Sequence, residues 1–345
     1  MMLTESQKAA IEEYGITKAA DILGIPRNTL KGRLLKYKLE QSDTWQGSEP
    51  AFEYPQDIPD AEPSYEELKE QVIRDFNRLA ANREAIKLLK VRVKIEGPYG
   101  LMIKGDPHLD NPGTNWPLLN QHLQLLKRTE GLFGANVGDM SDNWVGRLAR
   151  LYAHSNVSRS RAIILIEGYL REVPWLWIDP GNHDLWSGAD DPVRWLTRFS
   201  GIQYKWQGSR LELVPPSGAS ITINSRHDHP GYSQFHATHG PLKAAIQDGY
   251  NDTIYTCGHI HAGGYMIYPH NNGKICHIFR ASSYKVYDQH KDERGFSEHA
   301  LPAGVFVIDP HATEQLARVQ FYGDPEEGAD VLTWKRKRFK QGKTA

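Results

Sequence analysis

The chain has 345 residues, and its 41 basic and 42 acidic side chains leave a formal charge of −1, which excludes a uniformly basic protein that coats nucleic acid. Any contact with nucleic acid must therefore come from a local patch. Hydrophobic residues make up 39% of the chain and charged residues 24%, which favours two or more globular domains over a disordered or membrane protein. Two cysteines are too few for a disulfide scaffold, and the polar start lacks a signal-peptide apolar region, so we expect a cytoplasmic protein without a membrane partner.

Residues 1–40 predict a small all-α domain. Thr17 can cap a helix that ends at Gly24, and Pro26 can begin another after a tight turn. An earlier helix is expected over residues 5–14. The segment resembles the helix-turn-helix of Fis-type bacterial DNA-binding domains. The residues that carry this resemblance are Ala19, Ala20, Leu23, Gly24, Ile25, Arg27, Thr29 and Leu30.

Five basic residues and no acid lie between Ile22 and Leu39. A helix with this charge can enter the major groove of DNA, with its first residues at base edges and its lysines at phosphates. The candidate DNA-contacting residues are Arg27, Asn28, Thr29, Lys31 and Arg33. The alternative is a helical docking or oligomerisation unit with a solvated basic face. A unit this small needs a dimer or a second domain to bind DNA firmly.

The rest of the chain divides by composition. Residues 41–63 combine four prolines with many acids, which predicts an extended linker. Residues 64–90 predict a connecting helix, capped by Ser64, whose apolar stripe is interpreted as packing. From 91 to 325, short β-rich runs alternate with helical stretches such as 117–130 and 158–172, which predicts an α/β domain. Residues 326–345 are rich in Lys and Arg and are expected to form a flexible basic tail.

Fifteen histidines all lie between His108 and His311, and several of them belong to four short strings. The strings are GDPHLD with Asp106 and His108, VGDMSDN with Asp139, Asp142 and Asn143, PGNHD with Asn182, His183 and Asp184, and CGHIH with His259 and His261. Each string follows a β-like run. Polar residues that follow strands gather at the edge of a sheet, so we expect all four strings at the same edge of one sheet.

The residue types in these strings suit a pair of divalent ions about 3.5–4 Å apart. Neutral imidazoles and oxygen donors can bind such ions, a carboxylate can bridge them, and open positions remain for water and a phosphate. Alternate residues of an extended segment point the same way, so Asp106 is expected beside His108 and His259 beside His261. We therefore expect two divalent metal ions, with Mn²⁺ favoured and Fe, Zn, Ni or Mg as alternatives.

The order D-x-H, G-D-x-x-D, G-N-H-D and G-H-x-H resembles that of the calcineurin-like metallophosphoesterase superfamily, over about residues 100–310. The resemblance implies a four-layer αββα sandwich with a two-metal site at one rim. It implies one metal on Asp106, His108 and His261, a bridging Asp139, and a second metal on Asn182, His259 and one further histidine.

The resemblance also implies a mechanism. The nucleophile would be a metal-bridging hydroxide, and His183 would contact the phosphate and protonate the leaving oxygen. Asp184 would orient His183, and Asp142 and Asn143 would support the ligands from behind. The further histidine stays open between His227, which follows the run ITINS, and His239 in the segment ATHGP.

The substrate is less closely defined, because the superfamily acts on phosphomonoesters, phosphodiesters, nucleotides and nucleic acids. Asn143 and Asp184 stand where its protein phosphatases carry Arg and Glu, which argues against a phosphoprotein. The pairing with a helix-turn-helix favours a phosphodiesterase or nuclease that acts on DNA or a nucleotide phosphodiester. The alternatives are a DNA-binding regulatory or assembly protein with little turnover, and a small-molecule or nucleotide phosphatase. A homo-oligomer is compatible with each.

Overall fold

The computed structural model describes residues 3–42, 62–155, 157–188, 191–206, 208–287 and 301–343. The chain divides into two compact units, Met1–Val72 and Ile73–Ala345. Most of the predicted linker, residues 43–61, lies outside the described residues. Among the residues that are described, no helix is both long enough and apolar enough to cross a membrane.

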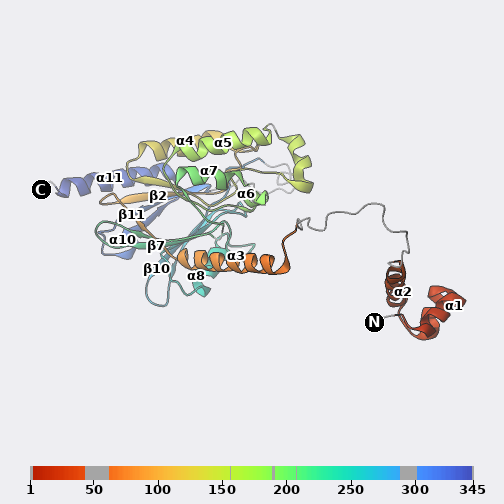
Figure 1. Ribbon diagram of the computed structural model, residues 1–345. Coiled ribbons are helices and arrows are strands. Elements are labelled where there is room, and N and C mark those ends of the chain that lie inside the picture. The colour runs from red at the N-terminus through yellow and green to blue at the C-terminus, as the bar shows by residue number, and fades with distance from the viewer. Residues whose placement is uncertain are drawn as a thin grey trace. The chain divides into compact units, whose positions relative to one another are not determined.

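The first unit contains the helices α1 (Glu5–Leu23) and α2 (Arg27–Ser42) (Figure 1). Thr4 caps α1, and Gly15, with φ 73°, breaks its helical geometry two residues before the predicted cap Thr17. The left-handed Gly24 ends α1, as the sequence predicts. The core of this unit includes Leu3, Ala19, Ala20 and Leu30. Ile22, in contrast, is 56% exposed.

Helix α3 (Tyr65–Ala85) corresponds to the predicted connecting helix. Ser64 and Glu67 form the predicted cap, since the Ser64 amide donates to Glu67 and the Glu67 amide donates to the Ser64 hydroxyl. The packing expected of its apolar stripe is absent among the described residues. None of the residues of α3 is buried, and the Phe76 side chain is 68% exposed.

The second unit is a mixed α/β structure with two six-stranded sheets, as the alternating runs predict. One sheet has the strand order β12-β11-β2-β3-β4-β5 and the other the order β1-β6-β7-β8-β10-β9. The strands of the first are β2 (Tyr99–Lys104), β3 (Leu132–Asn136), β4 (Trp175–Ile178), β5 (Gln203–Tyr204), β11 (Ala303–Ile308) and β12 (Val319–Tyr322). Those of the second are β1 (Leu89–Arg92), β6 (Ser209–Val214), β7 (Ile221–Ser225), β8 (Ile254–Cys257), β9 (Gly264–Pro269) and β10 (Ile275–Arg280).

Apolar side chains bury both faces of the first sheet. Leu101 and Trp177 of that sheet pack against Leu211 and Ile223 of the second sheet. On its outer face lie α4 (Trp116–Arg128), α5 (Arg159–Glu172), α7 (Pro192–Ser200) and α11 (Pro325–Lys343) (Figure 1). Helix α8 (His239–Gln247) covers the outer face of the second sheet. The shorter helices are η1 (Gly146–His154), α6 (Asn182–Leu185) and α10 (Gln315–Arg318).

The basic segment 326–345 is a correction to the sequence prediction, because it forms α11 as far as Lys343 and not a flexible tail. Leu332 of this helix is fully buried. Arg336 is also buried and donates to the carbonyl oxygen of Pro98 over 2.7 Å and to Glu130 over 2.7 Å. The long aliphatic stem of arginine can pack as apolar surface while its head finds acceptors.

Candidate metal centre

The predicted site residues follow strands of both sheets. Asp106 follows β2, Asp139 follows β3 and Asn182 begins α6 after β4, all in the first sheet. His227 and His259 follow β7 and β8 of the second sheet. The expectation of one sheet edge is therefore corrected. The two sheets pack face to face, so the carboxyl ends of their parallel strands bring these side chains together at a shared rim.

The backbone at this rim is strained. Seven non-glycine residues of the described chain have positive φ, and five of them lie in the predicted strings, with φ between 41° and 71°. They are His108, Asp139, Asn143, His259 and His261. Such residues cluster where a fold has to aim side chains at a common point. Gly181 has a related role, because a Cβ there would stand 1.9 Å from Asp139 Oδ1.

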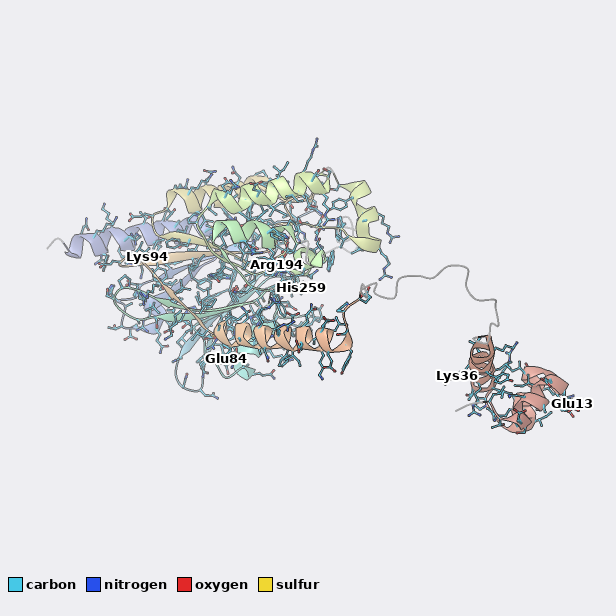
Figure 2. The ribbon with its side chains drawn as sticks, in the orientation of Figure 1. Glu13, Lys36, Glu84, Lys94, Arg194 and His259 are labelled. Carbon is cyan, nitrogen blue, oxygen red and sulfur yellow. The ribbon has the colours of Figure 1, made fainter. Side chains whose placement is uncertain are left out.

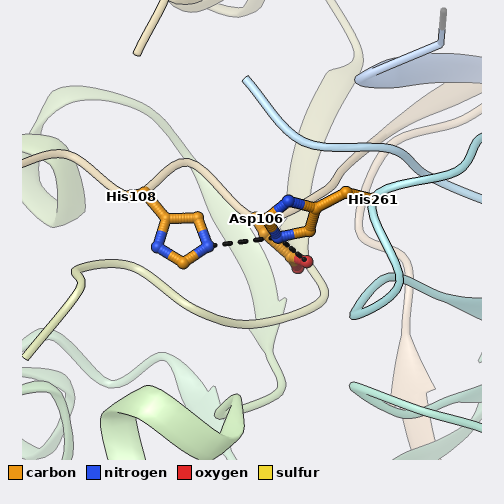
Figure 3. A group of neighbouring side chains, drawn as sticks. All are labelled: Asp106, His108 and His261. Atoms are coloured by element: carbon orange, nitrogen blue, oxygen red, sulfur yellow. Dashed lines mark hydrogen bonds and ion pairs between the residues drawn. The ribbon is translucent and has the colours of Figure 1, made fainter. Parts of the chain in front are cut away.

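Asp106, His108 and His261 form the first group of candidate ligands (Figure 3). His261 Nε2 lies 3.3 Å from Asp106 Oδ2 and 3.2 Å from His108 Nε2. Asp106 is fully buried, and its Oδ1 has no hydrogen-bond partner among the described residues. Burial raises the pKa of Asp106 to about 6.

Asp139, His227 and His259 form the second group. His227 Nε2 lies 3.0 Å from His259 Nδ1, 3.1 Å from Asn182 Oδ1 and 3.4 Å from Asp139 Oδ2. His227 Nδ1 donates to the Val137 carbonyl over 2.7 Å, which directs Nε2 toward Asn182 and Asp139. His227 also approaches the first group, with Nδ1 3.7 Å from Asp106 Oδ1, so the two groups adjoin.

Buried charge is concentrated in these two groups. Burial opposes ionisation of Asp139, but the nearby His227 outweighs it and lowers the pKa of the carboxyl. Burial likewise lowers the pKa of His227, and the Asp139 carboxylate reverses this effect and raises it to about 10. Carboxylates and imidazole nitrogens that converge in this way, with one carboxylate oxygen lacking a partner, fit divalent cations.

Asp142 and Asn143 lie behind the ligand groups. Asp142 Oδ1 is 2.8 Å from His108 Nδ1, which directs His108 Nε2 toward His261. Burial raises the pKa of Asp142, but the hydrogen bond from His108 prevails and lowers it to about 2. The Asn143 amide donates to the His183 carbonyl over 2.6 Å and to Ser187.

His183 projects its ring beside both groups. Its Nδ1 donates to the Asp142 carbonyl over 2.6 Å, and its Nε2 lies 3.9 Å from Asp139 Oδ2. Burial lowers the pKa of His183. The ring is enclosed by Trp186 and Trp144, whose centroids are 4.1 and 5.2 Å away.

The expected contact between Asp184 and the His183 ring is not present. Asp184 instead accepts from the amides of Met140 and Gly181, over 3.1 and 2.9 Å. The reason is that the first residues of α6 turn the Asp184 side chain back toward the backbone of the neighbouring loops, so it joins the second and third strings. The Asp142 carbonyl, and not Asp184, orients the His183 ring.

His239 begins α8 and belongs to neither group, whereas His227 belongs to the second. The geometry thus separates two residues that the sequence leaves as alternatives. Two contributors were not predicted from the sequence. Asp110 accepts from the Asp142 amide over 2.7 Å, and the Asn111 amide donates to the Asp142 carboxylate over 2.6 Å. The sequence signal for them is the acid that ends the first string and the amide that directly follows it.

The candidate DNA-contacting residues lie in the first unit. Arg27, Asn28, Thr29 and Lys31 are exposed in the first turns of α2. Arg33 is half-buried, and its Nη1 donates to Gln7 Oε1 over 3.5 Å. The start of α2 therefore presents polar and basic side chains to solvent.

Comparison with known proteins gives weak structural likenesses. The NAD nucleotidase of Haemophilus influenzae matches with a TM-score of 0.36 and 10% identity, over 65% of this chain and 49% of that one. The calcineurin-like phosphoesterase YfkN of Bacillus subtilis matches with a TM-score of 0.35 and 10% identity, over 72% and 98%. A metallophosphoesterase of Sphaerobacter thermophilus matches with a TM-score of 0.34 and 15% identity, over 65% and 87%.

No protein-family model and no curated protein sequence matches the chain. At TM-scores below 0.4, the structural likenesses do not assign an activity.

Proposed function

We propose that the protein is a dinuclear-metal-dependent phosphoesterase of the calcineurin-like kind. One observation carries the proposal. Two adjoining groups, Asp106–His108–His261 and Asp139–His227–His259, converge from strand ends of two sheets with a polar histidine beside them. Asn182 completes the second group through its Oδ1. Divalent ions held there would act as Lewis acids toward a phosphate and lower the pKa of water.

The residues of the chain contribute binding and proton transfer. His183 Nδ1 donates a hydrogen bond to the Asp142 carbonyl. Its Nε2 therefore faces the two ligand groups and can hold or release a proton. Trp144 and Trp186 flank this ring and reduce its contact with water. A histidine in this position can protonate the leaving oxygen of a phosphate ester.

A phosphodiester in a DNA context is the substrate class that we favour, with Mn²⁺ as the ion. The support is the exposed basic start of α2 in a chain that also carries the candidate metal centre. A nuclease or phosphodiesterase follows from this pairing. A small-molecule phosphatase, or a DNA-binding regulatory protein with little turnover, is the outcome if the tests below fail.

Hydrolysis of bis-p-nitrophenyl phosphate and p-nitrophenyl phosphate with Mn²⁺ tests the activity. We expect diester hydrolysis that a chelator removes and that His183→Ala or Asp139→Asn lowers by about 100-fold or more. The exposed His311, at the opposite end of β11 from Asp106, supplies the control variant His311→Ala, which should keep wild-type rates. Absence of metal-dependent hydrolysis of either ester would contradict the proposal.

A gel shift with duplex DNA tests the first unit. We expect Arg27→Ala/Lys31→Ala to weaken binding by about tenfold at low salt, because each cation can neutralise one phosphate. Lys18→Ala, which removes an exposed lysine of α1, is the matched control. If the wild-type protein and both variants bound duplex DNA equally, the proposal that the first unit binds DNA would be wrong. The phosphoesterase proposal would be unaffected.

A further inference from the structure

A pocket of about 660 Å³ opens beside α6, and its described lining includes none of the candidate metal ligands. Its lining includes Leu185, the last residue of α6 and only two positions after His183. The other residues that the argument uses are Arg194 and Arg198 of α7, together with Lys205 and Trp206 of the segment after β5. One edge of the pocket is therefore formed by the last residue of the helix that carries His183.

Helix α7 presents a basic face to this pocket. The Asp191 carboxylate caps the helix by accepting from the amides of Val193 and Arg194, over 2.9 and 3.2 Å. Val193 and Thr197 face inward and are buried, so Arg194 and Arg198, four residues apart, share the exposed face. Figure 2 labels Arg194.

Among the described residues, the pocket lining carries three cations, Arg194, Arg198 and Lys205, against one acid, Asp191. Within the described residues, Arg194, Arg198 and Lys205 form no ion pair with a carboxylate. Asp191 is the one acidic residue in the described lining, and its oxygens already accept from the backbone of α7 and from the Tyr204 hydroxyl. A polyanion is the ligand that complements such a surface.

Trp206 lies exposed in the lining of the pocket, and Trp195 lies exposed on α7 outside that lining. Trp206 is 54% exposed and Trp195 is 50% exposed, although tryptophan is usually mostly buried. Arg83 lies over the Trp206 ring at 5.7 Å and Arg198 over the Trp195 ring at 5.3 Å, which holds the indoles in place. An exposed indole beside phosphate-binding cations is a platform on which an unpaired base can stack.

The basic surface continues beyond the pocket. Arg83 also lines a second hollow of about 190 Å³, together with Lys87, Arg210 and Arg226. No acidic residue belongs to the described lining of this hollow, although Lys87 and Arg210 are paired with Glu84 and Asp252. Basic residues in two separate hollows favour a chain of several phosphates over a single nucleotide.

We propose that the pocket beside α6 binds a single-stranded polynucleotide, with backbone phosphates on Arg194, Arg198 and Lys205 and a base on Trp206. The strand would lead from the pocket to the metal centre, so this inference rests on the proposed function and names its substrate. A duplex fits less well, because its base faces are stacked internally and cannot meet an indole.

Fluorescence polarisation with a labelled 12-nucleotide single strand tests the inference on the full chain. Binding is measured in EDTA, so the result does not depend on hydrolysis. We expect Arg194→Glu/Arg198→Glu to weaken binding at least about tenfold and to reduce the salt slope by about 1.4, for two lost phosphate contacts. Trp206→Ala should weaken binding about fivefold or more through lost stacking.

The matched control is Arg128→Glu/Arg171→Glu, which reverses two exposed arginines of α4 and α5 that are paired with Glu326 and Glu167. It should bind like the wild-type protein. Circular dichroism melting checks that each variant is folded, and if the double variant is not, Trp206→Ala decides. The inference is overturned if the folded pocket variants bind the single strand like the control. Hydrolysis of bis-p-nitrophenyl phosphate by the wild-type protein tests the proposed function independently of this binding experiment.

Discussion

The two ends of strands β2 and β3 bury charge in different ways. At the carboxyl ends, Asp106 and Asp139 are buried among imidazoles, on a strained backbone, and one Asp106 oxygen lacks a partner. At the amino ends, the guanidinium of Arg336 meets the carbonyl of Pro98 and the carboxylate of Glu130 in relaxed helical geometry. The first arrangement combines backbone strain with an unpartnered carboxylate oxygen, whereas the second pairs two guanidinium nitrogens with Pro98 and Glu130 and leaves Nε without a partner among the described residues.

This difference predicts opposite consequences of substitution. Substitution of a residue at the carboxyl ends should remove activity but cost little stability. It relieves the repulsion between buried carboxylates and the backbone strain. A change at the amino ends should cost stability and leave chemistry intact. The predictions below test this contrast.

The largest expected effect is on catalysis. We predict that His227→Ala lowers metal-dependent hydrolysis by about 100-fold or more, since His227 Nε2 adjoins Asn182 and Asp139. Metal content measured by mass spectrometry should fall in parallel. His239→Ala should change both by less than about threefold, because His239 begins α8 outside the two groups. A larger loss from His239→Ala than from His227→Ala would reverse the assignment of the ligand.

The next effect is on stability. We predict that Arg336→Met lowers the free energy of unfolding by about 2–3 kcal/mol, because it leaves the carbonyls of Pro98 and Glu96 without their donor. Urea denaturation measures the change, and hydrolysis well below the melting temperature should stay near wild type. Lys337→Ala, at the exposed neighbouring position, should cost less than about 0.5 kcal/mol. Equal losses from the two variants would show that α11 is not anchored through Arg336.

Residues 326–345 were wrongly predicted to be a flexible tail, because a run of charged residues does not determine whether the segment is helical. Lysines and arginines dominate the segment, but Ala329, Leu332 and Arg336 recur at helical spacing and are all buried. The acceptors of Arg336 come from residues 96, 98 and 130, far away in sequence, so only tertiary structure could supply them. Periodicity was the available signal, and composition obscured it.

The site was predictable to a different extent. The four strings predict candidate metal ligands and predict that each follows a strand, and the structure brings Asp106, His108 and His261 together. The position of His227 beside Asp139 and His259 depends on the pairing of β7 with β8, which sequence patterns do not determine. Sequence patterns also do not determine that the site residues come from two sheets. The fold class followed from local alternation, but the strand order did not.

The smallest predicted effect concerns a buried carboxylate at the carboxyl end of β4, and its size depends on pH. Asp179 follows β4, is fully buried and accepts hydrogen bonds from the hydroxyls of Ser209 and Ser225. Burial raises its pKa to about 6, from an ordinary value near 3.8. The folded state therefore binds more protons than the unfolded state between about pH 4 and 6, and stability falls as pH rises through that window.

Asp179→Asn should abolish this fall, because an amide keeps hydrogen bonds to both serines and carries no charge to bury. We predict that the variant is more stable than wild type by about 2 kcal/mol at pH 7 and about equally stable at pH 4. Urea midpoints at the two pH values measure the difference. Ser225→Ala should instead lower stability at both, since it removes a donor from the carboxylate. A variant no more stable at pH 7 than at pH 4, relative to wild type, would mean that the serine hydroxyls already compensate the buried charge.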